Sequence, residues 1–151
     1  MDLNPEMATR AKDTEYAWAA GFIEADGCIH LSANGTCRAS VIVVQKAKTP
    51  LERLQRIFAT QYEIHPVWRS ERQYWRWTAT GTAAEFILRA ILPYLDHKRT
   101  QAERALALLE RRRVHPAKGG HGVKLTADEL AARLAIVHAE RLSEPAPVYA
   151  G

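Results

Sequence analysis

Residues 19–27 read Ala-Ala-Gly-Phe-Ile-Glu-Ala-Asp-Gly, a helix-forming run of small residues that ends in an acid followed by glycine. Asp26 falls in the last turn of the expected helix, directly before Gly27, which suits a left-handed position after a helix. The C-terminal end of a helix carries partial negative charge, so a carboxylate there is electrostatically unfavourable. Carboxylate oxygens are ligands of divalent cations. The sequence therefore predicts that a cation binds at this helix end.

The same helix has one side with almost no side-chain volume. Ala17, Gly21 and Ala25 are spaced four residues apart and therefore lie along one face. Such a stripe lets a second helix backbone approach closely. One interpretation is that two helices meet at the acid, and another is a structural helical dimer in which the stripe serves packing alone.

The elements around this helix are marked by capping signals and by alternation. Three Thr-x-x-Glu sequences predict the starts of helices at Thr49, Thr82 and Thr126. With the other periodic segments, the helices expected are 14–26, 49–60, 82–92, 97–113 and 126–142. Alternating, β-branched segments between them predict two hairpins, 28–34 with 36–45 and 63–70 with 73–80. The first hairpin is expected to close at Asn34-Gly35 in a type I′ turn.

This order predicts an α+β fold in which helices cover one face of an antiparallel sheet. The domain organisation expected is a flexible segment over 1–13, a single domain over 14–142 and a flexible tail over 143–151. The glycine-rich segment 115–124 is expected to be a loop.

The sheet face that helices leave open should carry polar side chains. On strand 73–80, Trp75 and Trp77 point toward the helices and leave Tyr74 and Arg76 outward. The candidate DNA-binding residues on this face are His30, Ser32, Asn34, Arg38, Ser40, Arg69, Arg72, Tyr74 and Arg76. Such side chains suit hydrogen bonding to phosphates and base edges. An ordinary solvated face is the alternative interpretation.

Composition narrows the class of protein. The chain has 151 residues, a net charge of +4 and a pI near 9.3, which favours an acidic partner such as nucleic acid. No run approaches the roughly 20 apolar residues needed to span a bilayer, and no signal-peptide pattern opens the sequence. Cys28 and Cys37 lack metal-site spacing and are not expected to pair. We expect an intracellular protein, cytoplasmic, nucleoid-associated or organellar, that is not secreted.

With these residues in view, the chain resembles the LAGLIDADG homing endonucleases, specifically the single-motif branch that works as homodimers. Residues 19–27 match the motif at six of nine positions, with Ala19 in place of the leading leucine and Glu24 in place of the first aspartate. The resemblance covers roughly residues 14–113, in the order α-β-β-α-β-β-α. It implies a concave sheet that binds double-stranded DNA as a saddle, and an intron-encoded protein.

The resemblance also implies a site and a reaction. Asp26 and the Ala25 carbonyl of two subunits would bind Mg²⁺, with Mn²⁺ or Ca²⁺ able to substitute for binding, and phosphodiester hydrolysis would leave staggered 3′ overhangs. Gln45 and Lys98 match the family's polar active-site residues. The family's arginine has no clean match, and Lys48 is the candidate to replace it.

The dimer interface implied by the resemblance lies on the motif helix. Its candidate residues are Ala17, Gly21, Phe22, Glu24 and Ala25. The resulting function is a metal-dependent, site-specific DNA endonuclease acting on a long pseudo-palindromic site. The alternative is an RNA-splicing maturase, or a DNA-binding protein of the same fold that does not cleave.

Overall fold

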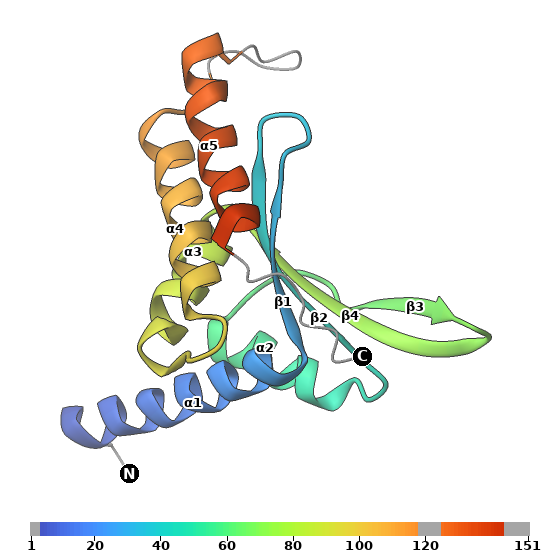
Figure 1. Ribbon diagram of the computed structural model, residues 1–151. Helices are drawn as coiled ribbons and strands as arrows, with labels where there is room; N and C mark the ends of the chain where they lie inside the picture. Colours follow the sequence, from blue (N-terminus) through green and yellow to red (C-terminus); the bar gives the residue numbers. More distant parts are fainter. Residues whose placement is uncertain (1–3, 118–124, 144–151) are drawn as a thin grey trace, which may run out of the picture.

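The computed structural model describes residues 4–117 and 125–143, which form a four-stranded antiparallel sheet with helices on one face (Figure 1). The helices are α1 (Pro5–Asp26), α2 (Thr49–Phe58), α3 (Gly81–Ile91), the short 3-10 helix η1 (Leu92–Tyr94), α4 (Arg99–Val114) and α5 (Ala127–Ser143). The strands are β1 (Gly27–Ser32), β2 (Arg38–Gln45), β3 (His65–Arg69) and β4 (Arg72–Thr80). The α+β class and the expected αββαββα order are confirmed. Residues 118–124 of the expected loop and 144–151 of the expected tail lie outside the described residues.

The two hairpins join through their inner strands. The sheet order is β1-β2-β4-β3, and β2 pairs with β4 from Ser40 opposite Thr80 to Gln45 opposite Trp75. Beyond this shared region the hairpins diverge. The β1–β2 hairpin runs beside α5, and the β3–β4 hairpin projects away from the helices (Figure 1). The sheet therefore has two arms around one central region.

The core lies between the sheet and the helices, as strand alternation predicts. The sheet contributes Ile29, Val41, Val43 and Trp77, all fully buried. Ala19, Ala20 and Ile23 are the buried residues of α1, opposite its small-residue stripe. Trp77 Nε1 also donates a 3.3 Å hydrogen bond to Thr60 Oγ1, which satisfies the indole inside the core. The expected orientation of Trp77 toward the helices is confirmed.

The first helix begins nine residues earlier than expected. Asn4 is its N-cap, with the side-chain oxygen accepting a 2.8 Å hydrogen bond from the Met7 amide, and Pro5 occupies the first helical position. Residues 5–13 are therefore helical rather than a loose segment. Their side chains are almost all exposed, so the hydrophobic periodicity that reveals a packed helix is missing there.

The turn between β1 and β2 also differs from the prediction. Instead of a two-residue Asn34-Gly35 turn, residues 33–37 form a longer loop, with Ser32 paired to Arg38. Both Gly35 (φ 59°) and Cys37 (φ 61°) have left-handed backbones. This register pairs even-numbered residues with even-numbered residues, for example His30 with Ser40. It therefore keeps the polar residues of both strands on one face, which a shift by one residue would reverse.

The capping predictions succeed for one helix and fail for two. Thr126 Oγ1 accepts a 3.2 Å hydrogen bond from the Glu129 amide, as predicted for the start of α5. In α2 the N-cap is Lys48 rather than Thr49, and in α3 it is Thr80 rather than Thr82. Glu85 was expected to cap the start of α3, but its buried carboxylate instead accepts hydrogen bonds from Arg89 and Arg113. A charge partner from another helix outweighs the local cap.

Helix α5 is attached to α4 by a carboxylate shared between two arginines. Glu129 accepts a 2.7 Å hydrogen bond from Arg111 of α4 and a 3.1 Å hydrogen bond from Arg133 of its own helix. The hydrogen bond from Arg111 and then that from Arg133 lower the pKa of Glu129 to about 2. The ionised carboxylate is therefore part of the contact between the two helices.

We expect Glu129 to make stability depend on pH in the acid range. Because its pKa is lower in the folded chain, its contribution is complete above the unfolded pKa of about 4.3 and is lost as pH falls through about 2. Urea unfolding of the wild type and of Glu129→Gln should therefore differ most near neutral pH and converge in acid. A difference that stays constant with pH would contradict this role.

Candidate metal centre and nucleic-acid interface

The C-terminal end of α1 presents Asp26 to solvent. Asp26 and Ala25 are both exposed, and among the described residues no hydrogen bond or ion pair engages the Asp26 carboxylate. The described part of one copy contains no cluster of three His, Cys, Asp or Glu side chains. The donors that are present, a carboxylate and a backbone carbonyl, are the oxygen ligands that Mg²⁺ prefers. They fit such an ion if a second copy completes the set.

Gly27 sets the direction of the chain as α1 passes into β1. Its backbone is extended (φ −91°, ψ 169°), so the expected left-handed conformation is wrong. Glycine is required for another reason: a Cβ at this position would lie 2.9 Å from both the Cα and the carbonyl oxygen of Ile23. The helix end and the first strand are therefore packed backbone against backbone, directly beside Asp26.

We expect Gly27→Ala to lower the free energy of unfolding by about 1–3 kcal/mol, the scale of overpacking against atoms that cannot move aside. Urea unfolding followed by circular dichroism measures this. Gly21→Ala is the matched control when both variants are unfolded at concentrations where the chain is monomeric, because in one copy a Cβ at Gly21 meets nothing within 4 Å and alanine favours the helix. If Gly27→Ala has the same free energy of unfolding as the wild type, the backbone contact between Gly27 and Ile23 does not exclude a Cβ, and the prediction is wrong.

Lys98 lies against the same helix end. Its Nζ donates hydrogen bonds of 2.9 Å to the Ile23 carbonyl and 2.5 Å to the Gly27 carbonyl, on either side of Asp26. The cation therefore neutralises the partial negative charge at the C-terminus of α1. Two carbonyls leave one N–H of the ammonium for a further acceptor. The structure thus brings Lys98 and the backbone around Asp26 together.

Glu24 holds the segment that carries Lys98. Its Oε1 accepts a 2.9 Å hydrogen bond from the Lys98 amide, and its Oε2 accepts a 3.4 Å hydrogen bond from the Asp96 amide. Glu24 and Lys98 are 74 residues apart in sequence, so sequence spacing gave no signal for this contact. Both carboxylate oxygens are engaged within one copy, and the interface role expected for Glu24 stays a prediction.

Gln45 and Lys48 lie near one another at the end of β2. Gly27 begins β1 opposite Val43, so β2 extends past β1 at the edge where α1 ends, and Gln45 is its last residue. Gln45 is paired with Trp75 of β4, and the Lys48 ammonium lies 4.8 Å from the Trp75 ring. This contact holds Lys48 on the helix side of the sheet, where Trp75 points.

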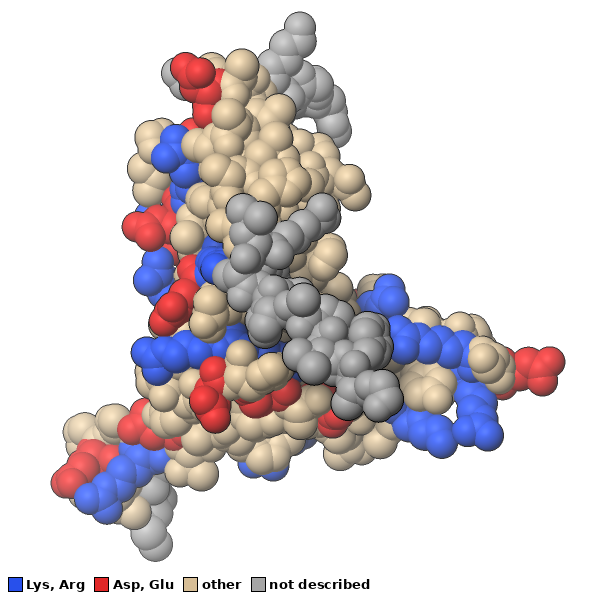
Figure 2. Space-filling view, in the orientation of Figure 1, with Lys and Arg blue, Asp and Glu red and all other residues tan. Residues whose placement is uncertain are grey.

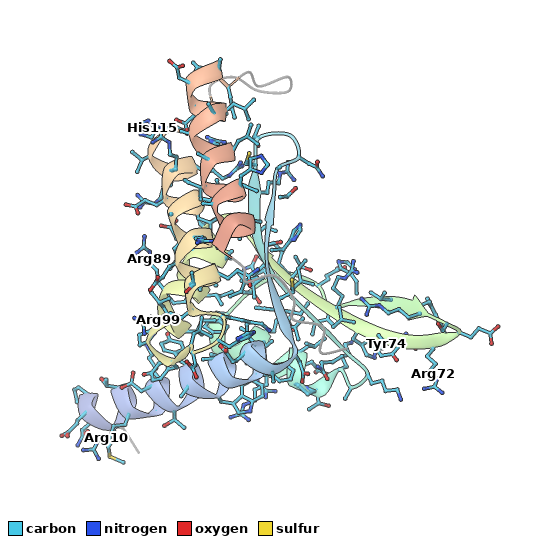
Figure 3. The ribbon with its side chains drawn as sticks, viewed as in Figure 1. Arg10, Arg72, Tyr74, Arg89, Arg99 and His115 are labelled. Carbon is cyan, nitrogen blue, oxygen red and sulfur yellow. The ribbon has the colours of Figure 1, made fainter. Side chains whose placement is uncertain are left out.

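The open sheet face carries the polar residues expected from the sequence. In the register of the strands, one face contains His30, Ser32, Arg38, Ser40, Arg69, Arg72, Tyr74 and Arg76. Asn34, also expected there, lies in the turn beyond β1. Figure 3 shows Arg72 and Tyr74 on the projecting β3–β4 hairpin. In Figure 2, Lys and Arg atoms gather over that hairpin, with acidic atoms only at its far end, whereas both signs alternate over the helices.

Two residues of β3, His65 and Trp68, are exposed on this hairpin but were not predicted as functional candidates from the sequence. His65 is opposite Arg76 and therefore shares the open face, which strand parity alone could have shown. Trp68 lies on the reverse face and is 68 % exposed because the hairpin projects past the helices. The sequence gives no signal for how far a hairpin extends beyond its neighbours.

The small-residue stripe of α1 is open in a single copy. Ala17, Gly21 and Ala25 are all exposed. Beside the stripe, Phe22 stacks on Trp18 with ring centroids 5.2 Å apart, and Arg53 of α2 lies 3.9 Å from the Trp18 ring. The exposed stripe therefore has little side-chain volume, and the stacked rings of Trp18 and Phe22 lie beside it.

No protein-family model and no curated protein matches the sequence. Among solved structures, the chain is similar to the homing endonuclease I-CvuI in complex with its target in the presence of 2 mM Ca, with a TM-score of 0.57 and 22% identity over 85% of this chain and 98% of that chain. It is also similar to the archaeal intron-encoded homing endonuclease I-Vdi141I complexed with DNA, with a TM-score of 0.69 and 14% identity over 89% and 87% of the two chains. A third is the LAGLIDADG homing endonuclease I-GzeII in complex with a DNA target, with a TM-score of 0.61 and 18% identity over 86% of this chain and 44% of that chain.

These similarities establish the fold. The chain has the LAGLIDADG homing-endonuclease fold, as residues 19–27 and the order of elements predict. In addition, none of the helices in the described part of the chain has the length and apolarity that a bilayer crossing requires.

Proposed function

We propose that the chain is a homodimeric, Mg²⁺-dependent endonuclease that cuts both strands of a pseudo-palindromic DNA site and leaves 3′ overhangs. The observation that carries the proposal is the exposed Asp26 carboxylate at the end of an exposed stripe of small residues. A second copy packed along this stripe brings a second Asp26 to the same place. One structural feature thus accounts for both the dimer and the metal site.

The lengths of the similar structures support a dimer. This chain spans 98% of I-CvuI but only 44% of I-GzeII, whose chain therefore has room for two such units. A two-fold dimer places the same face of each copy against DNA, so the recognised site has approximate two-fold symmetry.

The residues around α1 have distinct roles in the proposed reaction. Asp26 and the Ala25 carbonyl would hold the cation, and the chemistry that such a cation would supply is activation of a water and neutralisation of charge on the leaving oxygen. Lys98, fixed by the Ile23 and Gly27 carbonyls, directs its remaining N–H toward the scissile phosphate. Gln45 orients the water, and Lys48 adds positive charge beside it.

The open sheet face is the DNA-binding surface of this proposal. Its arginines on β3 and β4 bind phosphates and supply the salt-dependent part of the affinity. His30, Ser32, Ser40 and Tyr74 offer hydrogen bonds to base edges. The two arms of the sheet lie along the DNA on either side of the central region, where α1 ends (Figure 1).

A cleavage assay tests the proposal. We expect duplex DNA pools to be cut by the purified chain with Mg²⁺ and left intact with EDTA. Binding to structured intron RNA is measured in parallel. Tight RNA binding without DNA cleavage would favour a splicing maturase, and DNA binding without cleavage would favour a non-cleaving DNA-binding protein of this fold.

A further inference from the structure

Two arginines from the C-terminal helices hold the β1–β2 turn, residues 33–37. Arg112 of α4 donates through NH1 to the Thr36 carbonyl at 2.8 Å, to Thr36 Oγ1 at 2.9 Å and to the Cys37 carbonyl. Arg133 of α5 donates through NH1 to the same Thr36 carbonyl at 2.9 Å. Figure 1 shows α5 running beside this hairpin. The turn that begins β2 is therefore fixed from two helices.

Arg133 is buried, and each of its three side-chain nitrogens donates a hydrogen bond. It is 1% exposed, and its other nitrogens donate to Glu129 Oε1 at 3.1 Å and to the His115 carbonyl at 2.8 Å. His115 lies at the end of α4, next to α5 (Figure 3). A buried guanidinium is tolerated only when its donors are satisfied. Arg133 thus connects the end of α4, the start of α5 and the hairpin turn at one point.

The turn that these arginines hold is conformationally demanding. Cys37 has a φ of 61°, which is unfavourable for a side chain with a Cβ, and its side chain is fully buried. Burial raises the pKa of the Cys37 thiol, which keeps it a neutral packed group. Such a backbone persists only where surrounding contacts impose it. The hydrogen bonds to the Thr36 and Cys37 carbonyls are those contacts.

The turn carries candidate DNA-binding residues at a defined distance from Asp26. Asn34 lies within it, and Arg38 follows it as the first residue of β2. β1 is six residues long, which at about 3.3 Å per residue places the turn about 20 Å from the end of α1. At about 3.4 Å per base pair, this corresponds to roughly six base pairs from the centre of a bound site.

We propose that Arg133 and Arg112 are positioning residues for base recognition: they fix turn 33–37 so that Asn34 and Arg38 read the outer base pairs of each half-site. This inference rests on the proposed function, since it assigns to α4 and α5 a part in how that DNA is read. Arg133 and Arg112 act through the turn and do not touch the DNA themselves.

Amide hydrogen exchange of the full chain without DNA tests the first half of the proposal. We expect Arg112→Gln and Arg133→Gln to accelerate exchange of the Cys37 amide, which donates to the Asn34 carbonyl at 3.2 Å, at least tenfold. Arg99→Gln is the matched control, because it also removes one positive charge from α4 but lies at the other end of the helix, where Arg99 pairs with Glu103 (Figure 3). Unchanged exchange in both folded variants would overturn the proposal. If Arg133→Gln fails to fold, Arg112→Gln decides, since Arg133 and Glu129 of α5 then keep their own hydrogen bonds to the turn and to α4.

Selection of bound or cleaved sites from a randomised duplex library tests the second half. We expect the two variants to lose about tenfold in base preference roughly six base pairs from the centre, the scale of one good base contact, with central preference unchanged. A uniform loss of affinity with the base preference unchanged at every position would overturn the positioning role. Arg99→Gln should leave the base preference unchanged. A wild-type chain with no DNA preference would refute the proposed function, and the exchange result would still decide whether the arginines hold the turn.

Discussion

Asp26→Asn is expected to abolish DNA cleavage while leaving DNA binding nearly intact. The substitution keeps the size of the side chain but removes the charge that we propose holds the cation at the end of α1. The reaction rate should fall at least on the order of a thousandfold, the scale of a lost electrostatic stabiliser. Single-turnover cleavage and a gel-shift titration, both on the same duplex, measure the two effects separately.

Glu24→Gln is a useful comparison for this experiment, because it changes an acid on the same helix that engages the Lys98 and Asp96 amides instead of solvent. We expect it to retain metal-dependent cleavage at a reduced rate. Robust cleavage by Asp26→Asn would mean that another group holds the metal, and the proposed site would be wrong.

The second large effect concerns the stripe on α1. Gly21→Leu should dissociate the proposed dimer and leave the monomer folded, because a Cβ at Gly21 meets nothing within 4 Å in one copy and leucine favours a helix. Overpacking costs about 1–3 kcal/mol per side chain, and both copies carry the change. The dimer should therefore weaken by roughly 30-fold to 20,000-fold. Analytical ultracentrifugation measures this, and cleavage should be lost in parallel.

Ala11→Leu is the matched control for the stripe. It places the same leucine side chain at an exposed position of α1, in the part of the helix that precedes the stripe. We expect its dimer affinity and cleavage to match the wild type. If Gly21→Leu also dimerises normally, the two copies meet through another surface, and the two-acid centre cannot form as proposed.

The sequence predicted those features that depend on local rules. Strand alternation assigned His30, Ser40 and Arg76 to one face, and the polar face follows that assignment. The Thr126 cap and the αββαββα order also follow from short-range signals. The four-residue spacing of Ala17 and Gly21 predicted that they share one face of the helix, and both are exposed in one copy.

Features that depend on distant contacts could not be predicted. Gly27 was expected to be left-handed, but its place is set by the backbone of Ile23, against which any Cβ would collide. Glu85 was predicted to cap a helix, but its carboxylate pairs with Arg113 of α4. Arg133 lies 97 residues from Thr36, and no local pattern relates the two. In each case tertiary packing overrides a local preference.

The proposed function requires that two copies of this chain cut a symmetric DNA site through Asp26. A selection of cleaved molecules from a randomised duplex library tests this, with wild type and Asp26→Asn side by side in Mg²⁺ and in EDTA. We expect that only wild type with Mg²⁺ yields cut sites, and that their sequences share a two-fold symmetric pattern with 3′ overhangs. Cut sites without symmetry, equal yields from Asp26→Asn, or no cut sites at all would contradict it.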